Sequence, residues 1–274
     1  MNHPPVDAIS LESVSDLVHW VERARGQPGA GELALWYRGQ GRRVERIRPA
    51  FLRVNAAELP PAVRSWHKDV ETEGPVPVAE IEFNKEFVRR AASLLPRRDD
   101  LVDIYFLAEH HGLPTRLLDW TTNPLAAVFF ASATRPESDG EVIVTFPNYG
   151  VAGSESPREF AFTRQHPLLR QAIEYLFGEG ECPTEPRLFY VLPDLHAPRL
   201  IQQGACFTLH MPGAEEIPQS DFLRLCVPAA AKPELRQSLR TLGVSWATLF
   251  PDLDHVCREM KTSWGLDPGE EEGK

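Results

Sequence analysis

The sequence predicts a single α+β domain, in which a small central β-sheet of sequence-distant strands is flanked by helices. Apolar residues recur at helical spacing in several segments, and between these lie short apolar runs bounded by turn-forming residues, which are typical of strands. No internal repeat or low-complexity block divides the 274 residues. We therefore expect one domain over residues 1–274, with a core at about 30–210 and a C-terminal helical portion at about 228–265.

In the first half, the spacing of apolar residues predicts helices over Leu11–Val21, Phe83–Leu95, Leu101–Ala108 and Pro124–Phe130. Apolar runs predict extended segments over Leu33–Tyr37 and Thr115–Trp120. The sequence Arg38-Gly39-Gln40-Gly41 is expected to form a tight turn after the first of these strands, because glycine permits unusual backbone angles. The proline-rich stretch from Pro60 to Pro77 is expected to be a surface loop.

Capping residues support two of these helix boundaries. Asp99 or Asp100 can accept hydrogen bonds from the first free N–H groups of one helix, and Gly112 follows the end of that helix. Asn123 is expected to be the N-cap of the next helix, with Pro124 as its first residue.

The second half alternates between strands and helices again. Expected strands cover Glu141–Phe146, Arg187–Leu192, Ala205–His210 and Phe222–Val227, and expected helices cover about Pro167–Phe177, Pro233–Leu242 and Leu253–Met260.

Composition limits the classes of partner. A formal net charge of −10 makes the chain a poor binder of duplex DNA in bulk. Six arginines between Trp36 and Arg53 form a local exception, either a solvated face or a funnel for a nucleotide or single-stranded RNA. The four cysteines form no Cys-x-x-Cys pair, which disfavours structural zinc and favours reduced thiols. We find no signal peptide and no bilayer-length apolar run, so we expect a cytoplasmic protein without membrane contact.

The most informative segment runs from Glu109 to Ala131 and contains a polar turn between two apolar helical patterns. It holds two histidines, an arginine, an aspartate, a tryptophan and three threonines, a composition more typical of a site than of a connecting loop. The alternative is a buried hydrogen-bonded corner in which Arg116 pairs with Asp119.

These motifs resemble those of the FRG-domain family, named for a Phe/Tyr-Arg-Gly sequence. The first motif stands here as Trp36-Tyr37-Arg38-Gly39-Gln40, and the longest is His110-His111-Gly112-Leu113-Pro114-Thr115-Arg116-Leu117-Leu118-Asp119-Trp120-Thr121. The Gln203-Gly204-x-x-Phe207 sequence is similar to a later strand of the family. Glu109 stands where the family usually has glutamine, and its charge is expected to raise the pKa of His110. The family's association with bacterial defence and toxin-like contexts implies an antitoxin-like partner.

A second, fainter similarity is to ADP-ribosyltransferases, and it implies a related fold. Tyr37-Arg38-Gly39 looks like their first motif, Asp119-Trp120-Thr121-Thr122 like their second, and Gln202-Gln203-Gly204 lies where their third would fall. The similarity implies NAD as cofactor, with Arg38 holding a phosphate or ribose through planar guanidinium donors. Thr121 and Thr122 would bond the ribose and Trp120 would stack on a base.

The third motif lacks the glutamate that such transferases usually carry. A neutral amide at Gln202 or Gln203 cannot supply the same charge, so Glu109 or Asp119 would have to replace it, or the chain binds without reacting.

The histidines have two interpretations. His110 and His111 point about 100° apart on a helix, which makes them a poor chelating pair, and we expect no metal. His110 with Asp119 would form a general acid–base pair, or one histidine would cap the helix C-terminus.

The sequence thus favours an enzyme that binds NAD or another nucleotide and transfers or cleaves ADP-ribose, with RNA, protein or water as acceptor. The expected catalytic residues are Arg38, His110, Asp119 and Gln203. The expected cofactor-binding residues are Tyr37, Gly39, Gln40, His111, Arg116, Trp120, Thr121 and Thr122. The rival hypothesis is a non-catalytic module that recognises a nucleotide, an RNA or a protein.

Overall fold

A computed structural model describes residues 9–25, 35–54, 78–95, 100–145, 147, 161–185, 187–194 and 197–266. The expected loop at 60–77, the first residues of the strand expected at 33–37, and the alternative cap Asp99 lie outside the described residues.

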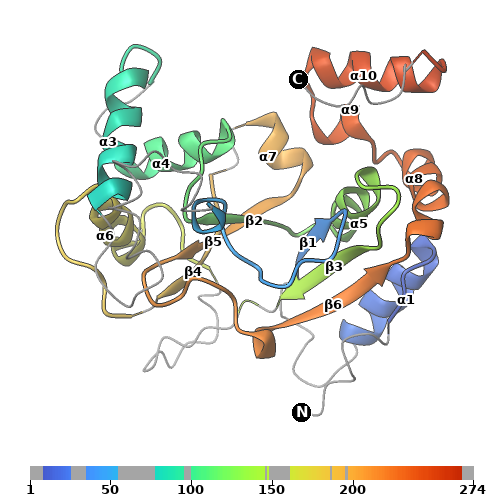
Figure 1. Cartoon of the computed structure of the whole chain (residues 1–274), viewed down its shortest axis with the longest axis horizontal. Helices are drawn as coiled ribbons and strands as arrows, with labels where there is room; N and C mark the ends of the chain where they lie inside the picture. Colours follow the sequence, from blue (N-terminus) through green and yellow to red (C-terminus); the bar gives the residue numbers. More distant parts are fainter. Residues whose placement is uncertain are drawn as a thin grey trace.

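The centre of the molecule is a six-stranded sheet with the order β4-β5-β2-β1-β3-β6, in which every neighbouring pair is antiparallel (Figure 1). The strands are β1 (Trp36–Gln40), β2 (Leu117–Thr121), β3 (Gly140–Thr145), β4 (Leu188–Val191), β5 (Ala205–His210) and β6 (Phe222–Val227). Apart from β4 and β5, neighbouring strands in the sheet are far apart in the sequence, and helices pack around the sheet. This confirms the α+β class and the sheet of sequence-distant strands.

The prediction of a tight turn after Tyr37 is wrong. Strand β1 continues through Gln40, and Arg38, Gly39 and Gln40 pair in register with residues of β3. Gly39 is needed for close packing, because a Cβ at this position would overlap the backbone carbonyl of Ala127 in the helix that packs on β1. The glycine therefore permits a close helix–strand approach within a regular strand.

Two groups of helices gather at opposite ends of the sheet (Figure 1). One group is α1 (Val14–Arg25), α5 (Pro124–Ala133) and α8 (Lys232–Thr241), which enclose a core with β1, β3 and β6. The other is α3 (Val78–Ala91), α4 (Leu101–His110) and α6 (Pro167–Leu176), which enclose a core with β2, β4 and β5. A third core includes Trp36, Leu118, Trp120 and Ile143, which alternate along their strands with residues of the first two cores.

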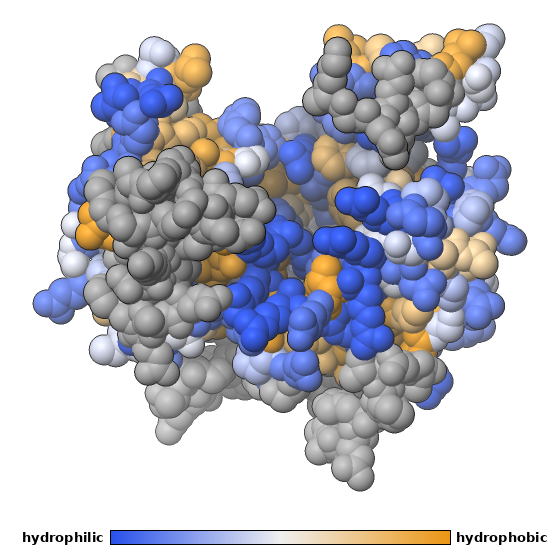
Figure 2. Space-filling view, viewed as in Figure 1, coloured by the Kyte–Doolittle hydropathy of each residue, from blue (hydrophilic) through white to orange (hydrophobic). Residues whose placement is uncertain are grey.

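The remaining elements are short or lie near the C-terminus. They are α7 (Pro198–Gln202), α9 (Trp246–Leu249), α10 (Leu253–Ser263) and the 3₁₀ turns Phe51–Arg53, Gln219–Asp221 and Ala229–Ala231. The space-filling view shows that hydrophilic residues dominate the middle of the face shown, between the two groups of helices (Figure 2).

The caps expected from the sequence are confirmed. The Asp100 side chain accepts from the N–H groups of Val102 and Asp103 at the start of α4. The Asn123 side chain accepts from the N–H of Leu125, with Pro124 as the first residue of α5. Gly112 follows α4 with a φ of 81°. Within the described part of the chain, no helix has the length and apolar character needed to cross a membrane.

Candidate ligand-binding cleft

A polar cleft of about 490 Å³ opens where α4, β2, α7 and β5 meet. The end of α4 contributes Glu109, His110, His111 and Gly112, and α7 with the turn after it contributes Arg199, Leu200 and Gln203. Asp119 from β2 and Phe207 from β5 complete the walls. The sheet order explains this convergence, because β5 and β2 are neighbours and Phe207 is the register partner of Asp119.

Arg38 lies beside this cleft, at the junction of β1 and β2. Among the described residues, these strands share one register pair, Tyr37 with Thr121, and Arg38 follows it. Its Nη1 donates to the backbone carbonyl of Asp119 at 2.7 Å and lies 3.8 Å from the Asp119 carboxylate. The Arg38 side chain is 16% exposed, and its Nε is buried with no hydrogen-bond acceptor among the described residues.

Glu109 lines the cleft and has a strongly raised pKa. Burial raises its pKa to about 7, and the negative charge of Asp119 adds to the shift. The hydroxyl of Thr115 donates to Glu109, and the charges of Arg38 and Arg53 oppose part of the rise. A carboxyl group that titrates near neutral pH can both accept and donate a proton, as a general acid–base catalyst must. The sequence pointed to a shift at His110, whereas the structure locates a perturbed group at Glu109 itself.

The two histidines lie at the mouth of the cleft. Their rings meet edge to face, with centroids 5.3 Å apart and planes at 87°. Among the residues that the structure describes, no group of three or more His, Cys, Asp or Glu side chains is arranged to hold a metal ion.

Thr121, Thr122 and Gln203 connect β2 to the turn that leads into β5. The Thr121 hydroxyl donates to the carbonyl of Gln203, and the Thr122 hydroxyl donates to the carbonyl of Gly204 at 3.3 Å. The side-chain amide of Gln203 donates to the carbonyl of Leu249 at 3.1 Å. These bonds hold the second and third motifs together, and they join α7 to α9.

Arg116 lies in the protein core rather than in the cleft. Its side chain is 1% exposed, and its Nε donates to both carboxylate oxygens of Glu80 at 2.8 and 2.9 Å. The pairing of Arg116 with Asp119 considered from the sequence is therefore replaced by a buried pair with Glu80. Arg116 has no exposed surface with which to bind a cofactor.

Trp120 is also placed in the core. It is 3% exposed, and its ring nitrogen donates to the hydroxyl of Thr208 at 3.0 Å. Trp120 is among the residues that line the cleft, but successive strand residues point to opposite faces, so its side chain packs in the third core on the face opposite to the Asp119 side chain. The ring expected to stack on a base is thus unavailable for stacking.

The first motif is divided between core and cleft. Tyr37 is 3% exposed and packs in the core beneath α5, where Gly39 also meets the helix backbone. Gln40 is the register partner of Glu141 at the far end of β1. Of this motif, Arg38 is the residue whose side chain reaches Asp119.

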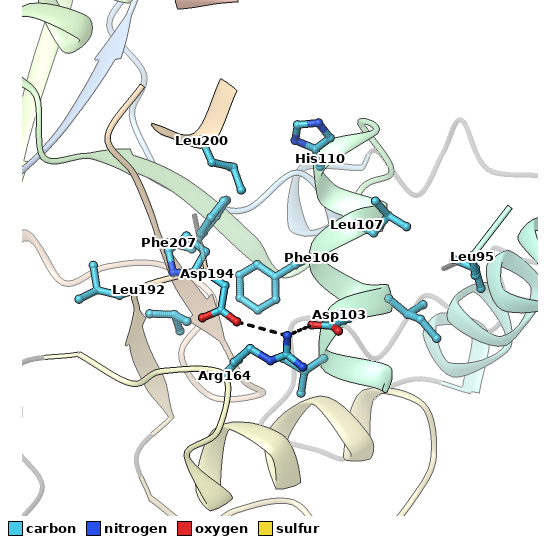
Figure 3. Close-up of a pocket in the computed structure, with 14 residues that line it drawn as sticks. Leu95, Asp103, Phe106, Leu107, His110, Arg164, Leu192, Asp194, Leu200 and Phe207 are labelled. Carbon is cyan, nitrogen blue, oxygen red and sulfur yellow. Dashed lines mark hydrogen bonds and ion pairs between the residues drawn. The ribbon is translucent and has the colours of Figure 1, made fainter. Parts of the chain in front are cut away.

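An apolar pocket of about 240 Å³ adjoins the cleft (Figure 3). His110, Leu200 and Phe207 line both spaces. The rings of Phe106 and Phe207 meet edge to face with centroids 5.3 Å apart, and Arg164 bridges Asp103 at 2.8 Å and Asp194 at 3.2 Å.

Sequence reasoning missed Arg199, Leu200 and Phe106 as wall residues. One available signal was the spacing of Phe106 and His110, which are four residues apart and therefore share a helix face. The short helix that carries Arg199 and Leu200 offered no comparable pattern.

The fold and the cleft together define a mixed α+β domain with a polar cleft large enough for a small molecule. Residues 33–140 match the family model of the FRG domain, so the chain contains an FRG domain. The match spans β1, β2 and the helices between them, and therefore includes Arg38, Glu109 and Asp119. No curated protein and no solved structure matches the chain.

Proposed function

We propose that this FRG-domain protein binds NAD or a closely related nucleotide in the cleft and transfers or cleaves its ADP-ribose group. One observation carries the proposal. The three stretches similar to ADP-ribosyltransferase motifs, which are far apart in the sequence, lie side by side on β1, on β2 and at the turn into β5.

The residues at the cleft fit a diphosphate or ribose. Arg38 has a buried Nε–H with no acceptor among the described residues, which a ligand oxygen would satisfy. Arg199, which lines the cleft from α7, adds a second cation, and its guanidinium lies over the ring of Phe250 at 4.8 Å. The cationic guanidinium groups favour an anionic group between α7 and β1.

NAD would supply an ADP-ribosyl group whose bond to nicotinamide is the one broken. Glu109 is the candidate for the acid that the third motif lacks, because its raised pKa lets it take a proton from the acceptor near neutral pH. Asp119 helps to keep that pKa high, and Arg38 positions Asp119 through its backbone carbonyl. His110 lines the same cleft and is the second candidate for proton transfer.

The apolar pocket beside the cleft suits a ring better than Trp120 does. Phe106 and Phe207 present apolar surface there, whereas the Trp120 ring is buried elsewhere. The family resemblance adds the expectations of a defence or toxin-like role, an antitoxin-like partner and a cytoplasmic location.

Calorimetric titration with NAD and assay of nicotinamide release test the proposal. We expect binding by the wild type, at least a tenfold weaker affinity for Arg38→Gln, and loss of nicotinamide release in Glu109→Gln. Arg23→Gln, a matched change on the exposed surface of α1, should leave both properties unchanged. Equal NAD affinity in Arg38→Gln and wild type, with both folded, would rule out the assignment. Binding without nicotinamide release would favour the non-catalytic recognition module.

A further inference from the structure

A second hollow, of about 400 Å³, lies between α8 and α10, beside the short helix α9. No described residue lines both this hollow and the cleft. In Figure 1, α10, α9 and α8 follow one another from the top down the right side of the molecule. The hollow is therefore a separate feature from the site proposed above.

Three arginines converge on this hollow. Arg236 and Arg240 lie one helical turn apart on α8 and are exposed, and Arg258 comes from α10. Among the described residues, no carboxylate forms an ion pair with any of the three, whereas Arg116, Arg164 and Arg224 each pair with at least one. Three guanidinium groups thus share one concave surface without a counter-charge bound to them.

The acidic residue that lines the hollow, Glu259, already accepts a hydrogen bond from the protein backbone. Glu259 accepts a hydrogen bond from the backbone N–H of Ala247 at 2.9 Å, near the start of α9. Counting the lining residues, three arginines and one glutamate leave a formal charge of +2. The chain as a whole has a formal charge of −10, so this local excess runs against the general surface charge.

Packing holds one of these arginines in place. The guanidinium of Arg258 lies over the ring of Trp246 at 4.4 Å, and Trp246 in turn packs against Phe129 with centroids 5.1 Å apart. A guanidinium stacked on an aromatic ring keeps its N–H edge free to donate. Because the Trp246 ring is already packed by Arg258, Phe129 and His255, the hollow offers a ligand charged donors rather than a stacking surface.

We propose that this hollow binds the diphosphate or triphosphate group of a phosphorylated ligand. Planar guanidinium groups bind phosphate oxygens in pairs, and three of them around 400 Å³ suit several linked phosphates better than a single one. The proposal does not depend on the function of the cleft.

Titration of the full chain with inorganic pyrophosphate, followed by calorimetry, tests this site. Arg236→Gln/Arg240→Gln removes two exposed donors that make no ring contact, so the fold should be preserved. We expect this variant to bind pyrophosphate at least tenfold more weakly than the wild type. Lys261→Gln, which removes one positive charge on α10 outside the hollow, should change affinity less than twofold. Any pyrophosphate binding that Arg38→Gln weakens belongs to the cleft, whereas the binding lost in Arg236→Gln/Arg240→Gln belongs to this hollow.

A second measurement locates the ligand. Pyrophosphate should shift the Nε–Hε NMR signals of Arg236, Arg240 and Arg258, assigned by single Arg→Gln variants. ATP and a 5′-triphosphorylated oligoribonucleotide carry the same group, and the one that displaces pyrophosphate identifies the source. The proposal is overturned if pyrophosphate does not bind, if the double variant binds it as the wild type does, or if neither triphosphate competes.

Discussion

Glu80 and Glu109 show how two carboxylates of one domain acquire different roles. Glu80 is 1% exposed, and both of its oxygens accept from Arg116. Removing one partner of such a buried pair leaves an uncompensated charge, so the pair is structural. Glu109 instead receives a hydrogen bond from the neutral hydroxyl of Thr115 and lies near the negative charge of Asp119. Burial and the charge of Asp119 hold the Glu109 proton more tightly and raise its pKa, although the hydrogen bond from Thr115 opposes part of this rise.

The raised pKa of Glu109 predicts how stability depends on pH. The folded state binds the proton up to about pH 7, whereas an ordinary glutamate loses it near 4.5. The stabilisation is therefore complete below about 4.5 and is lost as the pH rises through about 7. We expect the melting temperature of the wild type to fall relative to Glu109→Gln across this window. Thermal melts from pH 4 to 8 measure the difference.

The control for this experiment is Glu82→Gln, on the exposed surface of α3. Its difference from the wild type should not follow the same pH window. A constant difference between Glu109→Gln and wild type over the whole range would contradict the raised pKa.

The contact between β1 and α5 positions Arg38 at the scale of elements. Gly39 lets the backbone of α5 lie directly against β1, and α5 begins at the Asn123 cap just after β2 ends. The helix therefore braces β1 against β2 where Arg38 meets Asp119. The sequence predicted α5 and its cap correctly because a capping side chain acts on N–H groups only two or three residues away.

Gly39→Ala should disrupt this contact. A methyl group would overlap the carbonyl of Ala127, so strand and helix must separate, and we expect a loss of more than about 2 kcal/mol in the free energy of unfolding. Gly213→Ala is the control, since Gly213 has a φ of 89° but open space around it. That substitution should cost only about 1 kcal/mol of backbone strain. Urea denaturation compares the two, and an equal loss would mean that the close approach is unimportant.

The sheet links the two groups of helices at the scale of the whole molecule. Strands β1 and β2 belong to the cores beneath different helix groups, and they are neighbours in the sheet. The candidate cleft is bounded by β2 and β5 on one side and approaches β1 through Arg38. Its geometry therefore depends on both helix groups holding their strands in register.

A single domain over residues 1–274 predicts one cooperative unfolding transition. Differential scanning calorimetry should show one peak whose calorimetric and van't Hoff enthalpies agree. Two separated peaks, with the C-terminal helical portion melting apart from the sheet, would contradict the single-domain prediction. Repeating the scan with pyrophosphate would show whether a ligand bound between α8 and α10 raises the midpoint temperature of that transition.

The sequence by itself determined most of the elements and the family motif. Apolar periodicity and caps act over a few residues, so the longer helices and the strands could be placed, whereas the short helices α7 and α9 were missed. The long motif from His110 to Thr121 marked the FRG domain. The strand expected to end at Tyr37 was placed wrongly because Gly39 responds to a helix nearly ninety residues away along the chain.

Only the tertiary structure decided which polar residues share a space. Arg38 meets Asp119 across 81 positions of sequence, Thr121 meets Gln203 across 82, and Arg116 finds Glu80 across 36. Strand pairing brings Arg38 to Asp119 and Thr121 to Gln203, and the packing of α3 brings Glu80 to Arg116. Strand alternation separates Asp119 from its neighbour Trp120. The sequence therefore supplied the candidates, and the packing of distant strands divided them between the cleft and the core.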